Sequence, residues 1–241
     1  MTKVEAIKRV LEDFNGVATW EQIYGNIERY YPAVKVSRAW QEGIRGVLYR
    51  EIKKGRYFKK VGLGIFALKD YEEKPKPTAE EKQRMHPFIE GICLELGNFE
   101  GYATYTANPS AEFKNNIILA NLATLNDLPP FTYPEIIEEA RRIDVIWLNN
   151  QGPMFPQKVF EVVDSIGTLS EAFNRTLQLL SFRTDFFIIG PIEHQKRFNQ
   201  KINLEPYVRF KERYKFRNYD MMIKFYEQSI ELNKVKSEFF I

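Results

Sequence analysis

The chain has 241 residues, of which 44% are hydrophobic, 15% aromatic and 28% charged. This composition excludes a disordered or low-complexity protein and leaves room for one large domain or two smaller ones. No segment approaches the roughly 20 consecutive apolar residues of a transmembrane helix, and the first ten residues mix charges, so we expect neither a membrane span nor a signal peptide. The single cysteine, Cys93, excludes an intrachain disulfide, and we therefore expect a cytoplasmic protein.

The positive charge is concentrated in the first 70 residues. These residues contain 14 Lys and Arg against 8 Asp and Glu, which leaves a net charge of +6. The whole chain has a net charge of +3, so the remaining residues carry −3. This asymmetry favours a polyanionic partner for the first part of the chain.

Three short helices are predicted before residue 55. Apolar residues from Val4 to Phe14 follow helical spacing, and Asn-Gly follows them. Thr19 is expected to cap a second helix that ends at Pro32. Ser37 is expected to cap a third helix, which runs to about Lys54. The first part of the chain is thus predominantly helical.

A hairpin is predicted directly after these helices. Residues 56–70, RYFKKVGLGIFALKD, contain two β-prone runs around Gly62 and Gly64. Three short helices followed by a hairpin resemble a winged helix-turn-helix domain, and the resemblance covers about residues 1–70. It implies that the third helix enters the major groove of double-stranded DNA and that the hairpin wing touches phosphate or the minor groove.

The basic residues lie where this resemblance needs them. Residues 35–60 contain nine basic side chains and two acidic ones. Three polar residues near the start of the third helix are expected to reach base edges, and the others to contact phosphates. The alternative is a solvated basic face on a protein-interaction module. The side chains expected to contact DNA here are Lys35, Arg38, Gln41, Arg45, Lys53, Lys54, Arg56, Lys59 and Lys60.

The linker and the start of the second domain follow. Residues 71–84 are charged, contain proline and lack large aliphatic residues, which predicts an extended linker. The second domain is then expected over residues 85–241, beginning with a helix over about 80–96 that carries Glu90 and Glu95. Either glutamate can assist a metal site on the following strands, although an exposed helix glutamate is the commoner case. A short strand at 101–106 precedes an irregular segment at 107–134 with one short helix.

Two acids interrupt two otherwise apolar strands. Residues 134–148 change from helical to strand patterning near Ile143, which places Asp144 in a β-run, and Glu161 lies in the next run, KVFEVVDS. The two strands can pair as a hairpin with both acids at one end. Neighbouring carboxylates of this kind are typical ligands of Mg²⁺. The alternative is a structural pair of acids at a sheet edge, neutralised by Arg142 or Arg175.

These strands resemble those of the PD-(D/E)XK nuclease family. The helix LSEAFNRTLQLL carries Arg175 where one branch of the family tends to carry an arginine, and the segment DFFIIGPIEHQKRFNQKI resembles its C-terminal part, so that the match covers about residues 86–226. The resemblance implies an α/β fold with a central mixed sheet flanked by helices. It also implies Asp144 and Glu161 as ligands of Mg²⁺, for which Mn²⁺ can substitute, and we count Arg175 among the DNA-binding residues.

One position departs from the family pattern. The family places a lysine or an acid two residues after the strand acid, on the same strand face, where this chain has Val163. Valine cannot coordinate a metal or orient water. Either catalytic power is reduced or another side chain has taken over, for which Lys158, Asp164, Glu171 and Gln178 are the candidates beside Glu90, and the residues do not decide among them.

The expected function is cleavage of double-stranded DNA by a sequence-specific or modification-sensitive, metal-dependent endonuclease that acts as a homodimer. The alternative is a DNA-binding regulatory or recognition protein whose nuclease-like domain is catalytically impaired. His86 and His194 lie far apart in the sequence and are expected to be interface or helix-end histidines. Basic and aromatic residues alternate over 193–217, which can track a phosphate backbone. The alternative, which is compatible with it, is a strand over 207–216 with an aromatic core face and a basic solvent face. Residues 219–232 are expected to form a final helix.

Overall fold

The computed structural model describes residues 1–72 and 85–240. The chain divides into two compact units, one comprising residues 1–76 and 228–241 and the other residues 77–227. Residues 73–84, which include most of the predicted linker and the predicted first turn of the next helix, lie outside the described residues. The domain limits predicted at residues 70 and 85 stay predictions.

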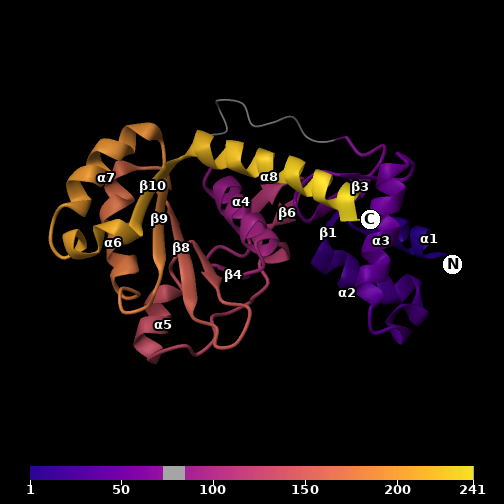
Figure 1. The fold of residues 1–241 in the computed structure, drawn as a ribbon, viewed down its shortest axis with the longest axis horizontal. Helices are drawn as coiled ribbons and strands as arrows, with labels where there is room; N and C mark the ends of the chain where they lie inside the picture. The colour runs from indigo at the N-terminus through magenta and orange to yellow at the C-terminus, as the bar shows by residue number, and fades with distance from the viewer. Residues whose placement is uncertain (73–84, 241) are drawn as a thin grey trace. The chain divides into compact units, whose positions relative to one another are not determined.

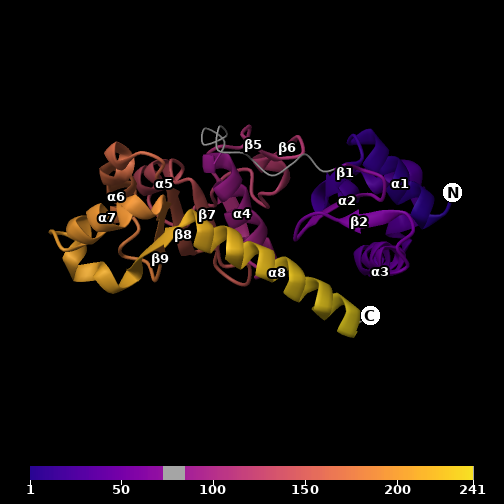
Figure 2. The ribbon, with the colours of Figure 1, turned by 90° about the horizontal axis from the view of Figure 1, so that it is seen from above.

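Residues 1–72 of the first unit form three α-helices (Figure 2) and a small antiparallel sheet in the order β1-β3-β2. Residues of all three helices and of the hairpin share one apolar core. The predicted hairpin is confirmed, while the strand that precedes the second helix was not predicted. The elements are α1 (Lys3–Asp13), β1 (Val17–Thr19), α2 (Trp20–Tyr30), α3 (Trp40–Lys53), β2 (Phe58–Lys60) and β3 (Ile65–Leu68).

The helix ends show which capping predictions hold. Thr19 caps α2 in a reciprocal arrangement with Gln22, as predicted for Thr19. The cap predicted at Ser37 is wrong, because residues Pro32–Val36 form a 3-10 helix and α3 begins only at Trp40. The Ser37 hydroxyl instead accepts from the amide of Ala39 at 3.3 Å.

The second unit is an α/β structure with a mixed five-stranded sheet in the order β10-β9-β8-β7-β4 (Figure 1). The predicted hairpin of the two acid-bearing strands is confirmed, since β7 pairs antiparallel with β8; β8, β9 and β10 are parallel. The strands are β4 (Ala103–Thr106), β7 (Val145–Leu148), β8 (Pro156–Val162), β9 (Asp185–Gly190) and β10 (Tyr214–Asn218).

Helices cover both faces of this sheet. On one face α4 packs against Trp147, whose indole nitrogen donates to the Cys93 carbonyl. On the other face, residues of α5, α6 and α7 form one core with alternate strand residues such as Ile146 and Val159. The helices are α4 (Met85–Phe99), α5 (Pro134–Ala140), α6 (Leu169–Leu177), α7 (Gln195–Ile202) and α8 (Tyr219–Phe240), the last of which runs past the predicted end.

Three segment predictions need correction. Asp144 does not lie inside a strand but directly before β7. The segment at 107–134 contains, beside a short 3-10 helix, an unpredicted hairpin of β5 (Glu112–Lys114) and β6 (Ile117–Ile118).

The strand predicted over 207–216 is wrong for most of its length, because Tyr207–Arg213 forms a 3-10 helix and only β10 is extended. Tyr207 and Phe210 are three residues apart, and a 3-10 turn directs both toward the core, which alternation in a strand would not do. In neither described stretch, 1–72 or 85–240, is a helix long and apolar enough to cross a membrane.

Candidate metal and acid-histidine site

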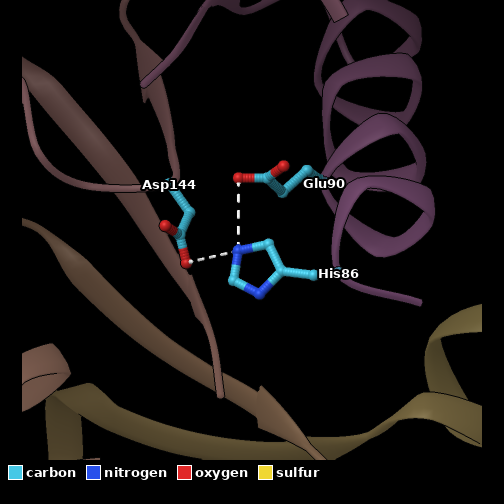
Figure 3. A group of neighbouring side chains, drawn as sticks. All are labelled: His86, Glu90 and Asp144. Atoms are coloured by element: carbon cyan, nitrogen blue, oxygen red, sulfur yellow. Dashed lines mark ion pairs between the residues drawn. The ribbon is translucent and has the colours of Figure 1, made fainter. Parts of the chain in front are cut away.

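Three side chains from two distant parts of the chain meet at the start of α4 (Figure 3). His86 and Glu90 are four residues apart on this helix and therefore share a face. His86 Nε2 lies 3.5 Å from Glu90 Oε1 and 3.5 Å from Asp144 Oδ2. One imidazole nitrogen thus faces two carboxylates, one from the helix and one from the residue before β7.

The other side of the imidazole faces a third acid. His86 Nδ1 lies 3.1 Å from Asp164 Oδ2, just beyond the end of β8. The hydroxyl of Tyr219, at the start of α8, donates to the second oxygen of Asp164. A continuous polar chain therefore runs from Tyr219 through Asp164 and His86 to Glu90 and Asp144.

Backbone and amide donors hold the two inner acids. The amide of Val162 donates to Asp144 Oδ2 at 2.7 Å, which ties Asp144 to the neighbouring strand. Asn108 Nδ2 donates to Glu90 Oε1 at 2.5 Å. Glu90 is fully buried, and its other oxygen, Oε2, has no hydrogen-bond partner among the residues that the structure describes. Such an atom carries a desolvation cost unless something else contacts it.

The acids hold a positive charge on the imidazole. Burial alone lowers the pKa of an imidazole, but hydrogen bonds with Asp144, Asp164 and Glu90 outweigh it and raise the pKa of His86 to about 12. Burial raises the pKa of the Glu90 carboxyl. Burial would also raise the pKa of Asp164, but its hydrogen bonds to His86 and Tyr219 prevail and leave it lowered.

Glu161 lies beside this cluster but is held separately. Val145 faces Phe160 across β7 and β8, so the next residue pair outward in this register is Asp144 and Glu161. The Glu161 carboxylate is fully buried and accepts from Arg175 Nε at 2.8 Å, with a second bond from the terminal guanidinium nitrogen. Burial raises the pKa of Glu161 while the Arg175 charge opposes that shift.

Three of the predicted catalytic candidates are not brought to the cluster. Lys158 lies on the face of β8 opposite to Glu161, where its ammonium donates to the Tyr102 hydroxyl at 2.8 Å and lies over the Trp147 ring. Glu171 and Gln178 are exposed on and just after α6. Of the other predicted candidates, Asp164 and Glu90 do join Asp144.

His86 is the residue whose place the sequence did not reveal. It was expected at an interface or a helix end, and the available signal was its spacing of four residues from Glu90 at the start of a helix. His194 is buried, with Nδ1 3.0 Å from the Val163 carbonyl oxygen. Val163 itself is 1% exposed and belongs to the apolar core on the α6 side of the sheet.

The donor set fits a divalent cation. Glu90, Asp144, Asp164 and Glu161 bring four negative charges when ionised, and His86 and Arg175 bring two positive ones, which leaves an excess of two negative charges. His86, Glu90 and Asp144 each offer one ligand atom, and these atoms lie within 4.8 Å of one another. The unpartnered Glu90 oxygen belongs to the same carboxylate. Carboxylate oxygens with one imidazole nitrogen form a donor set that divalent metals accept.

The basic residues of the first unit lie mostly at its surface. Gln41 is exposed in the first turn of α3, and Arg38 precedes that helix rather than belonging to it, because α3 starts late. Lys53, Lys54 and Arg56 are exposed around the end of α3.

Five predicted DNA contacts already have partners within the unit. Lys35 pairs with Glu28 at 2.6 Å. Arg45 donates from Nε to the Tyr24 hydroxyl at 2.7 Å and lies over the Trp20 ring. Lys59 and Lys60 are only half-exposed; Lys59 donates to the carbonyl of Tyr71, and Lys60 lies over the ring of Tyr49. Arg45 is held in place by aromatic side chains, and Lys54 lies 3.9 Å from Glu51. Among the described residues this leaves Arg38, Gln41, Lys53 and Arg56 as the predicted contacts without a side-chain partner.

Comparison of the sequence with protein-family models and with curated proteins finds no match to either. A function for this protein therefore has to be inferred from the geometry and charge of its sites.

Proposed function

We propose that the protein is a metal-dependent endonuclease that cleaves double-stranded DNA at specific or modified sequences. The observation that carries this proposal is the meeting of Glu90 and Asp144, each 3.5 Å from one imidazole nitrogen, in a cluster with excess negative charge. A buried acidic cluster has to be neutralised, and a hydrated divalent cation does so while leaving positions for a phosphate.

Glu90 and Asp144 would hold Mg²⁺ or Mn²⁺, with Glu161 directly beside them. The bound ion supplies an activated water and offsets charge on the phosphate. Around it, the Val162 amide keeps the Asp144 carboxylate turned toward the site, and Asn108 does the same for Glu90. Arg175 holds the Glu161 carboxyl group by two hydrogen bonds within its buried surroundings.

The surrounding fold supports the same proposal. Acids at the ends of two antiparallel strands, a glutamate from the preceding helix and a further parallel strand resemble the PD-(D/E)XK arrangement. The first unit, with three helices and a hairpin, resembles a winged helix, and we propose that it binds the duplex through Arg38, Gln41 and the basic residues after α3. Cleavage of both strands at a symmetric sequence favours a homodimer.

Plasmid cleavage tests the proposal. Supercoiled plasmids, methylated and unmethylated, are incubated with the full-length protein and Mg²⁺ or Mn²⁺. We expect nicked and linear products that disappear with EDTA, with Asp144→Asn and with Glu90→Gln. The matched control is Glu100→Gln, which neutralises an exposed glutamate beyond the end of α4 and should cut normally. Duplex binding without cleavage on any of these plasmids contradicts the enzyme.

A second candidate function rests on a specific observation. Glu161 forms an ion pair with Arg175. The position that carries a lysine or an acid in the resembled family is the buried Val163. Both features suit a DNA-binding regulatory or recognition protein that no longer cuts. This function is favoured if the same preparation binds duplex DNA with strong salt dependence and leaves every plasmid intact.

A further inference from the structure

The two nitrogens of His86 face carboxylates of different kinds. Nε2 faces Glu90 and Asp144, which are buried and belong to the proposed metal site. Nδ1 faces Asp164, which is half-exposed and is anchored by the Tyr219 hydroxyl. Asp164 therefore fixes the ring from the Nδ1 side, and Nε2 points toward the two acids of the proposed metal site.

This arrangement is the one that orients a metal-bound histidine. Histidine ligands commonly donate their second ring N–H to a carboxylate, which fixes the tautomer and the direction of the ligating nitrogen. Asp164 can accept from Nδ1–H, so that Nε2 is the nitrogen left for a cation. Coordination requires the neutral ring, and the Nε2 proton is then released to solvent.

A second observation separates this cluster from an ordinary group of acids. Glu90 Oε2 is buried and has no hydrogen-bond partner within the described parts of the chain, although Oε1 of the same group has two neighbours, His86 and Asn108. A fully buried carboxylate with one unsatisfied oxygen is costly in free energy. The oxygen that faces His86 is Oε1, so a cation at this cluster would remove that cost by contacting both oxygens of the Glu90 carboxylate.

We propose that His86 Nε2 is a metal ligand beside Glu90 and Asp144, that Asp164 and Tyr219 position it, and that the site accordingly prefers a transition-metal ion such as Mn²⁺ to Mg²⁺. This inference rests on the proposed metal site and adds the nitrogen ligand to it. Nitrogen donors strengthen binding of first-row transition ions, whereas Mg²⁺ favours oxygen and keeps its waters. Sequence resemblance alone had implied Mg²⁺ as the principal ion.

Electron paramagnetic resonance of Mn²⁺ on the full-length protein tests this directly. Pulsed spectra detect the ¹⁴N of a coordinated imidazole, and the chain has only two histidines. We expect a ¹⁴N signal in the parent protein, its loss in His86→Ala and its retention in His194→Gln. We also expect the affinity for Mn²⁺ to fall at least tenfold in His86→Ala, while the affinity for Mg²⁺, measured by competition, changes less than threefold.

The positioning residues have their own expected result. Asp164→Asn should keep the ¹⁴N signal but weaken Mn²⁺ binding by about 10- to 100-fold, as removal of outer partners of histidine ligands does. Tyr219→Phe should act in the same direction and less strongly. Glu100→Gln, an exposed acid, should leave Mn²⁺ affinity unchanged.

The outcomes distinguish this inference from the proposed site. If Mn²⁺ does not bind the parent, or binds equally to Glu90→Gln and Asp144→Asn, the metal site itself is wrong. If binding needs Glu90 and Asp144 but gives no ¹⁴N signal, the metal site stands and the role of His86 is wrong. The parent spectrum decides between these cases even if His86→Ala fails to fold.

Discussion

The buried Glu161 carboxylate faces the Arg175 guanidinium across the gap between β8 and α6, with Nε 2.8 Å from Oε1. Glu161 has no exposed side-chain surface, whereas that of Arg175 is 26% exposed. The pair is therefore one-sided: the acid depends on the arginine for neutralisation, while the arginine can also reach solvent.

We expect Arg175→Ala to be strongly destabilised, because it leaves the buried Glu161 charge without a partner. Breaking a fully buried pair costs about 3–5 kcal/mol, and the partial exposure of Arg175 should keep the loss somewhat below that range. Added Mn²⁺ should raise the melting temperature more in this variant than in the parent, since Glu161 becomes free to contact a cation.

Thermal unfolding with and without Mn²⁺ checks this prediction. The control is Arg142→Ala, which breaks an exposed pair with Glu139 and should cost no more than about 1 kcal/mol. Equal shifts by Mn²⁺ in the parent and in Arg175→Ala would show that Glu161 lies outside the reach of the metal site.

Local signals in the sequence predict much of the fold, and the pairing of Asp144 with Glu161 follows from them. Thr19 caps α2 because its partner Gln22 is three residues away, and the hairpin of β7 and β8 joins neighbouring segments. The approach of His86 to Asp144 could not be predicted in this way. The two residues are 58 positions apart in the sequence. Their contact depends on how α4 packs against the sheet, and no local sequence pattern predicts that packing.

The same limit explains the errors. Ser37 looks like a cap, but the proline at position 32 starts a 3-10 helix that delays α3. The aromatic and basic residues before β10 resemble a strand, yet Arg213 is committed to the fold. Its guanidinium donates to the carbonyls of Leu180, Phe182 and Thr184, which are far away in sequence.

Close packing of α4 against the sheet predicts the effect of Gly97→Ala. A Cβ at Gly97 would lie 2.6 Å from Thr104 Cγ2 and 2.7 Å from the Trp147 indole nitrogen. Overpacking of this kind typically costs about 1–3 kcal/mol. Because the shift moves α4, which also carries Glu90, we expect weaker Mn²⁺ binding as well. Urea denaturation and Mn²⁺ titration measure the two effects.

Gly25→Ala is the matched control for Gly97→Ala. Gly25 is an exposed residue within α2, and a Cβ there meets nothing within 4 Å. Alanine should stabilise this helix by about 0.5–1 kcal/mol. If both alanine variants lose similar stability, the close approach of α4 to Trp147 is not the cause.

Acid should weaken one specific surface pair, Asp127 with Arg141. Two guanidinium nitrogens donate to Asp127 at 2.7 and 2.8 Å, and these bonds hold the pKa of Asp127 below its ordinary value of 3.8. A lowered pKa means that the stabilisation is present above pH 3.8 and is lost as the pH falls through the folded-state value.

The variant Asp127→Asn should therefore unfold at lower urea concentration than the parent near pH 6. The difference should narrow below pH 3.8, where the parent protein also loses the charge. Urea midpoints across this range measure it, and a difference that stays constant with pH would mean that the pair contributes through packing alone.

Salt dependence should separate phosphate contacts from other basic residues. Lys53 and Arg56 are exposed near the end of α3, and neither forms an ion pair with another residue of the described stretches 1–72 and 85–240. Each single alanine variant should lower the slope of log affinity against log salt by about 1 for a duplex. Lys8→Ala on α1 is the control and should leave the slope unchanged. Unaltered slopes in both test variants would place the DNA contact elsewhere.

Introducing at Val163 the lysine that PD-(D/E)XK nucleases carry at the resembled position should not create a conventional nuclease site. Val163 lies in the apolar core, its amide donates to the Ile189 carbonyl at 2.7 Å, and its own carbonyl lies 3.0 Å from His194 Nδ1. A lysine there would have to bury its ammonium or displace the neighbouring side chains. We expect Val163→Lys to lose stability and to cut no faster than the parent, whereas Val163→Ile keeps the apolar character and tests volume alone. A stable Val163→Lys protein with enhanced cleavage would mean that the side chain at 163 reaches the proposed metal site after all. Val163, rather than the pairing of Glu161 with Arg175, would then limit the rate of DNA cleavage by the parent protein.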